Sequence, residues 1–146
     1  CLFIRVALTG TRQRSVGGGH CLPWPWALNI NGEVLYSPSG QMAWQALQAV
    51  LTQTKTSVDI GLMQISWRYH RSVLGSSWQA LDPYHNLRVA AAILRDCFVE
   101  HSHWIQSAGC YHAPNDPARA DRYGQRVKAH LMRLTDTPQE VRFENP

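Results

Sequence analysis

Two residues, Asn31 and Gly32, define one element of the fold more firmly than any other part of the sequence. They lie in the segment ALNINGEVLYS, between two short runs that are typical of β-strands. Asn-Gly is the strongest short-range signal for a two-residue hairpin turn, because both turn residues must adopt positive φ angles. The sequence therefore predicts a small two-stranded ribbon over residues 27–37.

An amphipathic helix is predicted next, over residues 39–53. Ser39 is a suitable N-cap, since its hydroxyl can accept a hydrogen bond from a free N–H of the first turn. The apolar side chains with the spacing of one helix face are Met42, Ala46, Leu47, Val50 and Leu51.

Three further helices are predicted downstream, over residues 82–101, over residues 103–112, and from Pro117 onward. Asn86 is the expected N-cap of the first, and Asp116 is the expected N-cap of the last, with Pro117 at its first helical position. The apolar stripe of the first is Leu87, Ala91, Leu94 and Phe98. One side of the last carries Tyr123, Val127, His130 or Leu131, and Leu134.

The N-terminal part has a different character. Residues 2–9 are predicted to be the end of a helix that Gly10 stops. In residues 12–26, RQRSVGGGHCLPWPW, three glycines and two prolines exclude regular structure and predict a long loop. Beyond Pro138 the tail is expected to be loosely ordered. Because the chain has no internal repeat, residues 1–146 predict a single α+β domain that is mainly α, with one small β-hairpin.

Length and composition agree with one self-sufficient domain. A chain of 146 residues can bury ~68–70% of its unfolded surface. With 45% apolar and 16% charged residues, it is too apolar to be disordered. The net charge of +4 suits a polyanionic surface such as a cell wall, whereas nucleic-acid binding is not predicted, because no basic run or nucleic-acid-binding motif is present.

No apolar stretch reaches the ~20 residues that span a bilayer. The chain begins with Cys1 instead of Met, which is consistent with a processed product or a fragment.

The cysteines and histidines do not match a metal motif. The cysteines are Cys1, Cys21, Cys97 and Cys110. Their spacings match neither a zinc ribbon nor a Cys-x-x-Cys redox pair, so two interpretations stay open: two disulfides, favoured as Cys97–Cys110 and Cys1–Cys21 by nearness in sequence, or four buried free thiols. His101 and His103 are two residues apart and HEXXH is absent, so neither a metal nor a cofactor is expected.

The segment VDIGLMQISW places Gln64 inside an apolar run. A buried carboxamide must find hydrogen-bond partners or destabilise the fold by a few kcal/mol, and the simplest interpretation is that it bonds to neighbouring backbone. However, GLMQI resembles the signature of the soluble lytic transglycosylase and goose-type lysozyme superfamily, enzymes that cut the glycan strands of peptidoglycan.

Other motifs support this resemblance, and their order and spacing agree with the family across residues 4–131. AGCYHAPNDPARADRYGQRV is similar to its third motif, and VALTGTRQ is similar to the helix end that carries its catalytic glutamate. PWPWALNINGEVLYS and DIGLMQISWRYH resemble a branch associated with conjugative elements and type IV secretion or pilus systems. The resemblance implies a lysozyme-like fold, peptidoglycan glycan strands as the ligand, secretion, conjugation or pilus components as partners, and the bacterial periplasm or cell envelope as the location.

The resemblance also implies the residues of a sugar-binding groove, with Gln64 facing the substrate. The implied binding residues are Thr11, Gly61, Leu62, Met63, Gln64, Ile65 and Tyr111. One of Trp24, Trp26 and Trp67 is expected to line this groove, since aromatic rings stack on sugar faces, although tryptophans in a small domain belong first to the core.

The family's catalytic acid is missing at the matching position. The resemblance implies a single glutamate that protonates the glycosidic oxygen and then deprotonates the muramic 6-hydroxyl, leaving a 1,6-anhydro sugar. That position is Gly10 here, followed by Thr11 in place of the family's usual serine. Either the glutamate has been lost or replaced, or the match is out of register, or another acid serves.

Glu33 and Asp59 are the substitute acids close enough in sequence to reach the groove. Glu33 is expected to be a solvated hairpin residue, and Asp59 a cap or the partner of an arginine. We therefore expect little or no lytic activity from this chain. The alternative is a non-catalytic domain that binds peptidoglycan or serves as a scaffold in a secretion or conjugation apparatus.

Overall fold

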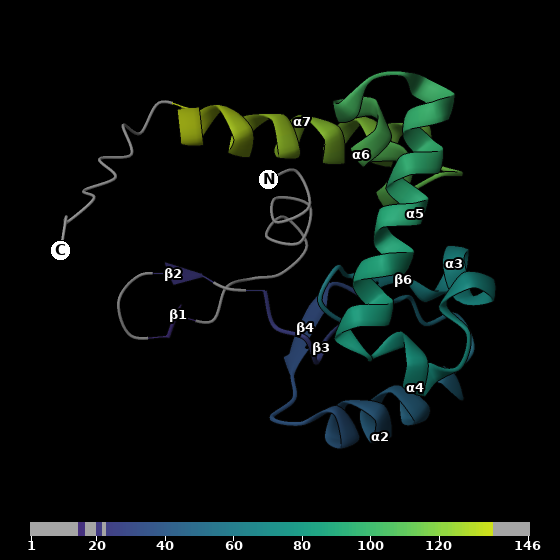
Figure 1. Ribbon diagram of the computed structural model, residues 1–146. Coiled ribbons are helices and arrows are strands. Elements are labelled where there is room, and N and C mark those ends of the chain that lie inside the picture. The colour runs from purple at the N-terminus through teal and green to yellow at the C-terminus, as the bar shows by residue number, and fades with distance from the viewer. Residues whose placement is uncertain (1–14, 17–19, 22, 136–146) are drawn as a thin grey trace, which may run out of the picture.

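The computed structural model describes residues 15–16, 20–21 and 23–135 (Figure 1). Several predicted features lie outside these residues: the helix end over residues 2–9, the positions of Gly10 and Thr11, the cysteine Cys1, and the tail beyond Pro138.

A four-stranded antiparallel sheet has the strand order β4-β3-β5-β6. Its strands are β3 Ala27–Ile30, β4 Glu33–Tyr36, β5 Val58–Ile60 and β6 Ile65–Ser66. The predicted hairpin is confirmed, since β3 pairs with β4 and the turn residues Asn31 and Gly32 have φ angles of 51° and 97°. The strands β5 and β6 were not predicted, because lengths of three and two residues are too short to show the alternation that marks a strand.

A second, much smaller sheet corrects the prediction of an irregular loop over residues 12–26. β1 Ser15–Val16 pairs with β2 His20–Cys21 in an antiparallel ladder. Glycine and proline disfavour strands only at the positions they occupy, and none of these four residues is either.

The helices make up most of the described chain, which confirms the mainly α class of the α+β fold. They are α2 Gly40–Leu51, α3 Trp67–Leu74, α4 Ser77–Ala80, α5 Pro83–His101, α6 Trp104–His112 and α7 Pro117–Thr135. Figure 1 shows α5 running from the sheet, near α2 and α4, to the level of α6 and α7. Of these described helices, none combines the length and the hydrophobicity that crossing a bilayer requires.

Two predicted N-caps are confirmed. The Ser39 hydroxyl accepts a hydrogen bond from the Met42 N–H at 3.3 Å, and an oxygen of Asp116 accepts one from the Arg119 N–H at 2.9 Å. Met42 itself was predicted to face the core but is 52% exposed, because the buried side of α2 consists of Ala43, Leu47 and Val50.

The predicted range of α5, residues 82–101, is confirmed to within one residue, but its predicted N-cap, Asn86, was wrong. The N-cap is Asp82, whose carboxylate accepts from the His85 N–H, while Asn86 lies within the helix and is 0% exposed. The helix begins four residues earlier than Asn86 suggested, since Pro83 fits the first helical position. The buried stripe therefore includes Asn86 in place of Leu87, which is 40% exposed.

The core joins the sheet to the helices. Leu28 of β3, Leu47 of α2, Ile60 of β5, Leu94 of α5 and Val127 of α7 are all at most 1% exposed and belong to one hydrophobic cluster. Burial of such a side chain stabilises the fold by about 1.5–3 kcal/mol. The sheet and the C-terminal helices are therefore parts of one packed body.

A disulfide joins Cys97 of α5 to Cys110 of α6, as favoured from the sequence, so free thiols were the wrong interpretation for this pair. The bond closes a loop between residues 13 apart in sequence. We expect the double variant Cys97→Ala, Cys110→Ala to lose about 3 kcal/mol of unfolding free energy, because the unfolded chain regains the entropy of that loop. Urea unfolding of both proteins measures this, and equal stabilities would contradict a structural role for the bond.

Candidate functional site

A polar cleft of about 1000 Å³ lies between the sheet and the C-terminal helices. The sheet side contributes Asn29, Asp59 and Gln64. The helical side contributes His112 at the end of α6 and, from α7, side chains that include Arg119 and Tyr123. Ligand sites of this size are common, and a few convergent polar groups fix the ligand's orientation in them.

The turn between β5 and β6 positions Gln64 on the cleft wall. Gly61 and Gln64 both have positive φ angles, of 77° and 51°. The Gly61 N–H donates to the Ala27 carbonyl at 2.9 Å, which ties the turn to β3. A methyl group at Gly61 would lie 2.7 Å from Asn86 Nδ2, so both conformation and close packing require glycine there.

Asn86 holds this turn from the side of α5. Its Oδ1 accepts from the Met63 N–H at 2.8 Å, and its Nδ2 donates to the carbonyls of Ile60 and Ala80, each at 3.0 Å. Three buried backbone groups thus depend on one carboxamide. Sequence reasoning missed this role; the available signal was that Asn86 shares a helical stripe with Val89, Ala90 and Leu94.

The side chain of Gln64 bonds to the backbone, as the simpler interpretation predicted, and it also lies on the cleft wall. Its Nε2 donates to the carbonyls of Gly61 at 2.9 Å and Ala27 at 3.2 Å, which is the simple interpretation of backbone bonding. Its side chain also lines the cleft, and its buried Oε1 has no hydrogen-bond partner within the described residues. An unpaired buried acceptor destabilises the fold by roughly 1–3 kcal/mol, so a ligand N–H or O–H that reached it would be bound favourably.

The other predicted binding residues in this turn lie behind the cleft wall. Met63 and Ile65 are at most 2% exposed in the core, and Leu62 packs against that core. Tyr111 is 4% exposed and its hydroxyl donates to the Met63 carbonyl at 2.8 Å, so it supports the turn from beneath instead of lining the cleft. Burial raises the pKa of Tyr111 well above its usual value.

The two substitute acids differ sharply in environment. Glu33 is an exposed hairpin residue, as expected, and does not line the cleft. Asp59 is 8% exposed and lines it. Burial raises the pKa of Asp59 to about 6, against the opposing effects of the Arg119 charge and a hydrogen bond with Ser66. Of the carboxyl groups that the structure describes, only Asp59 is buried.

The pKa of Asp59 predicts a specific pH dependence of stability. Because its folded-state pKa of about 6 lies above the ordinary aspartate pKa of 3.8, the folded state binds this proton more tightly, and the stabilising effect of the proton is lost as pH rises from about 4 to about 6. Asp59→Asn removes this loss. We expect the change in unfolding free energy caused by Asp59→Asn to be more favourable at pH 7–8 than at pH 4. The difference should be on the order of 1–3 kcal/mol. Urea unfolding over this pH range measures the difference; an effect of Asp59→Asn that does not depend on pH would contradict the assignment.

An aromatic pair forms the helical wall of the cleft. The rings of His112 and Tyr123 stack with centroids 4.0 Å apart and an interplanar angle of 13°. Burial, assisted by the charges of Arg119 and Arg126, lowers the pKa of His112 to about 4, so its ring is neutral at physiological pH. None of the described residues that line the cleft is a tryptophan. Trp24 and Trp26 instead pack edge-to-face with each other, with centroids 5.9 Å apart.

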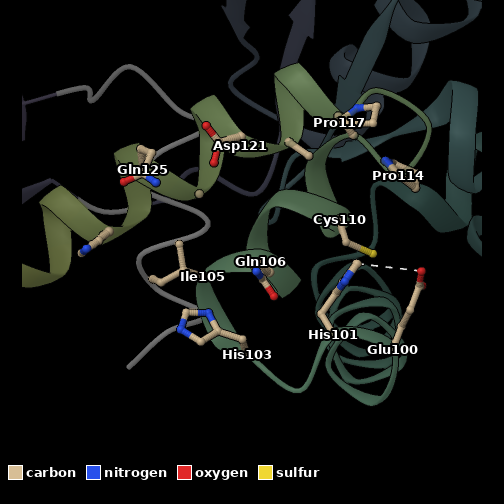
Figure 2. Close-up of a pocket in the computed structure, with 14 residues that line it drawn as sticks. Glu100, His101, His103, Ile105, Gln106, Cys110, Pro114, Pro117, Asp121 and Gln125 are labelled. Atoms are coloured by element: carbon tan, nitrogen blue, oxygen red, sulfur yellow. Dashed lines mark ion pairs between the residues drawn. The ribbon is translucent and has the colours of Figure 1, made fainter.

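A second pocket, of about 620 Å³, lies between α7 and the turn that joins α5 to α6 (Figure 2). Donor atoms of Glu100, His101 and Cys110 lie within 4.8 Å of one another there. However, the Cys110 sulfur is bonded to Cys97 and cannot act as a thiolate ligand. His103, the other histidine considered from the sequence, is not part of this group.

Together these features define a mainly helical α+β domain with a polar cleft built on a rigid β-turn. Invasion protein IagB of Salmonella typhimurium is similar to it, at 29% identity over 113 residues that cover 73% of this chain and 71% of that protein. The protein of the same name from Salmonella typhi is 29% identical over 119 residues, covering 77% and 74%. No protein-family model and no solved structure matches the chain.

Proposed function

We propose that this chain is a lysozyme-like domain of the lytic transglycosylase type, and that its cleft binds the glycan strands of peptidoglycan. Gln64 is the observation that carries this proposal. The motif that suggested the family forms a turn with two positive φ angles, held by Asn86, which sets the Gln64 carboxamide in the wall of a polar cleft, its buried Oε1 without a partner among the described residues. The similarity to IagB over most of both chains adds support.

The chemistry of the cleft suits an amino sugar. Acetamido N–H and hydroxyl groups need acceptors such as the side-chain oxygen of Asn29, which lines the cleft together with Gln64. The Asn29 oxygen already accepts from the Gly32 N–H at 3.0 Å, which leaves one lone pair for a ligand. The half-buried His112, stacked on the buried Tyr123 and neutral at physiological pH, adds an aromatic ring beside them.

The proposal includes little or no lytic activity, because Gly10 occupies the position of the family's catalytic glutamate. In that reaction one carboxyl group protonates the leaving oxygen and then removes the proton of the 6-hydroxyl. Asp59 is the described residue whose buried carboxyl comes nearest to this requirement. It lies on a strand and not at the helix end that the family uses, so it remains the substitute to test and not the assigned acid.

A non-catalytic binding or scaffold domain is the second candidate, and Gly10 favours it. Such a domain would keep the cleft and place a secretion, conjugation or pilus apparatus on the cell wall. The periplasm or cell envelope is the proposed location in both cases. The two candidates differ in one respect: only a lytic enzyme that has lost its acid regains activity when a carboxyl group returns to position 10.

Co-sedimentation with purified sacculi tests the shared part of the proposal. We expect the chain to sediment with the sacculi while it releases 1,6-anhydromuropeptides at no more than the rate of a protein-free control. Failure to sediment would contradict glycan binding. Release at a rate comparable with an active lytic transglycosylase would contradict the loss of the acid and direct attention to Asp59.

A further inference from the structure

We infer that reduction of the disulfide between α5 and α6 opens a zinc site at the edge of the second pocket, here called the thiol site. Its ligands are Cys97, Glu100, His101 and Cys110. A bound zinc ion would then replace the disulfide as the link between the two helices. This inference is independent of the function proposed for the cleft.

Three of the four donor groups already lie together. Donor atoms of Glu100, His101 and Cys110 are all within 4.8 Å of one another, and His101 Nε2 lies 4.0 Å from Glu100 Oε1. Figure 2 shows these three side chains converging at one edge of the pocket. Tetrahedral zinc, with bonds of ~2.0–2.3 Å, holds its ligand atoms about 3.3–3.8 Å apart. Small rotations therefore suffice, and the Glu100 side chain, which is 71% exposed, has room to make them.

Cys97 supplies the fourth donor. It precedes Glu100 by three residues and His101 by four, a spacing that places all three side chains on one face of α5. The disulfide holds its sulfur next to that of Cys110, at the border of the donor group. After reduction the two sulfurs are no longer bonded and can move to the separation of about 3.8 Å that two thiolates adopt on one zinc ion.

Zinc is the metal that this set of donors fits. Two thiolates, one imidazole and one carboxylate match its preference for four sulfur, nitrogen and oxygen ligands. The disulfide form has no thiolate and offers only the imidazole and the carboxylate, so the state of the bond controls the affinity for the metal. Asp121 and Lys128, which also line the pocket, have opposite charges and together do not repel a cation.

A dithiol reductant is needed to open the site, and Cys110 is the accessible end of the bond because it lines the pocket. A thiolate of the reductant attacks the Cys110 sulfur, and Cys97 leaves as a thiolate. The second thiol of the reductant then displaces Cys110 from the mixed disulfide. Two electrons and two protons pass to the protein, and the reductant becomes a disulfide. Zinc displaces the thiol protons when it binds.

Competition with a chromophoric zinc chelator tests this inference. The protein is the full chain without a histidine tag, carrying Cys1→Ser and Cys21→Ser so that Cys97 and Cys110 are its only cysteines. It is reduced with a phosphine, which is removed under nitrogen before zinc is added. We expect the reduced chain to bind one zinc ion and the disulfide form to bind none.

Two histidine variants in the same background separate the thiol site from zinc binding by the two thiols alone. His101→Ala should weaken zinc binding by at least about tenfold, since even the loss of a group that only orients a ligand has an effect of this size. His103→Ala is the matched control: His103 is an exposed histidine of the same pocket outside the donor group, and its replacement should leave the affinity unchanged.

Circular dichroism of each reduced protein establishes whether it is folded. If reduction alone unfolds the chain, zinc should restore the folded spectrum, because metal binding then supplies folding free energy, and His101→Ala should need at least about tenfold more zinc. Equal zinc binding by the reduced chain with and without His101→Ala would overturn the inference. Zinc binding by the disulfide form, or none by the reduced chain, would overturn it as well.

Discussion

Replacing Gly10 with glutamate is expected to raise the release of 1,6-anhydromuropeptides from sacculi by about 10²–10⁴-fold, the usual contribution of a positioned general acid and base. On the proposed resemblance, Gly10 stands at the position where the lytic transglycosylase family carries its only proton donor, and glycine has no group that titrates. The substrate cleft is proposed to be intact, so the acid is the missing part. Chromatography of the soluble products against time measures the effect.

Gly10→Gln is the matched control for this prediction. Glutamine has nearly the size and polarity of glutamate but cannot donate a proton in this reaction, so its product release should stay at the level of the unaltered chain. Equal release by the two variants would show that the carboxyl group is not the missing part, which would favour the binding or scaffold domain. If the unaltered chain is already active, loss of that activity in Asp59→Asn would identify the substitute acid.

Replacing Asn86 with alanine is expected to lower the unfolding free energy by about 3–5 kcal/mol. The Asn86 side chain is fully buried and bonds the Met63 N–H and the carbonyls of Ile60 and Ala80. Alanine would leave these three backbone groups without their partner and create a cavity beneath the turn that carries Gln64. Urea unfolding measures the loss.

Asn115→Ala is the control for this second prediction, because Asn115 is exposed between α6 and α7 and its replacement should change stability by about 0.5 kcal/mol at most. Asn86→Asp is a graded test, since it keeps the acceptor for the Met63 N–H but removes both donors and can introduce a buried charge. A loss below about 1 kcal/mol in Asn86→Ala would contradict the view that this residue fixes the turn.

The parts of the fold that were predicted correctly depend on local signals. Asn31-Gly32 defines its own turn, and Ser39 and Asp116 cap their helices through bonds to residues three positions ahead. Asn86 was misread because asparagine is favoured at N-caps, and only contacts with residues 23 and 26 positions earlier reveal its role. Met42 has helical spacing but is 52% exposed, away from the buried side of α2.

The candidate site could be predicted only in part, for the same reason. Gln64 was found because its motif is continuous in sequence. His112, Tyr123 and three arginines of α7 line the same cleft as Asp59 because α6 and α7 pack beside the sheet, and a pairing between segments so far apart has no local signature. An observable signal did exist for these arginines, because Arg119, Arg122 and Arg126 are three and four residues apart on a predicted helix.

Backbone amide chemical shifts during titration with the disaccharide tetrapeptide test the central claim, that the cleft of Gln64 binds peptidoglycan glycan. The account predicts saturable shifts confined to residues 59–64 and to the cleft side of α7 around Arg119 and Tyr123, with little change in Gln106 and Lys128 of the second pocket. Shifts centred on the second pocket, or no shifts at millimolar ligand, would contradict it.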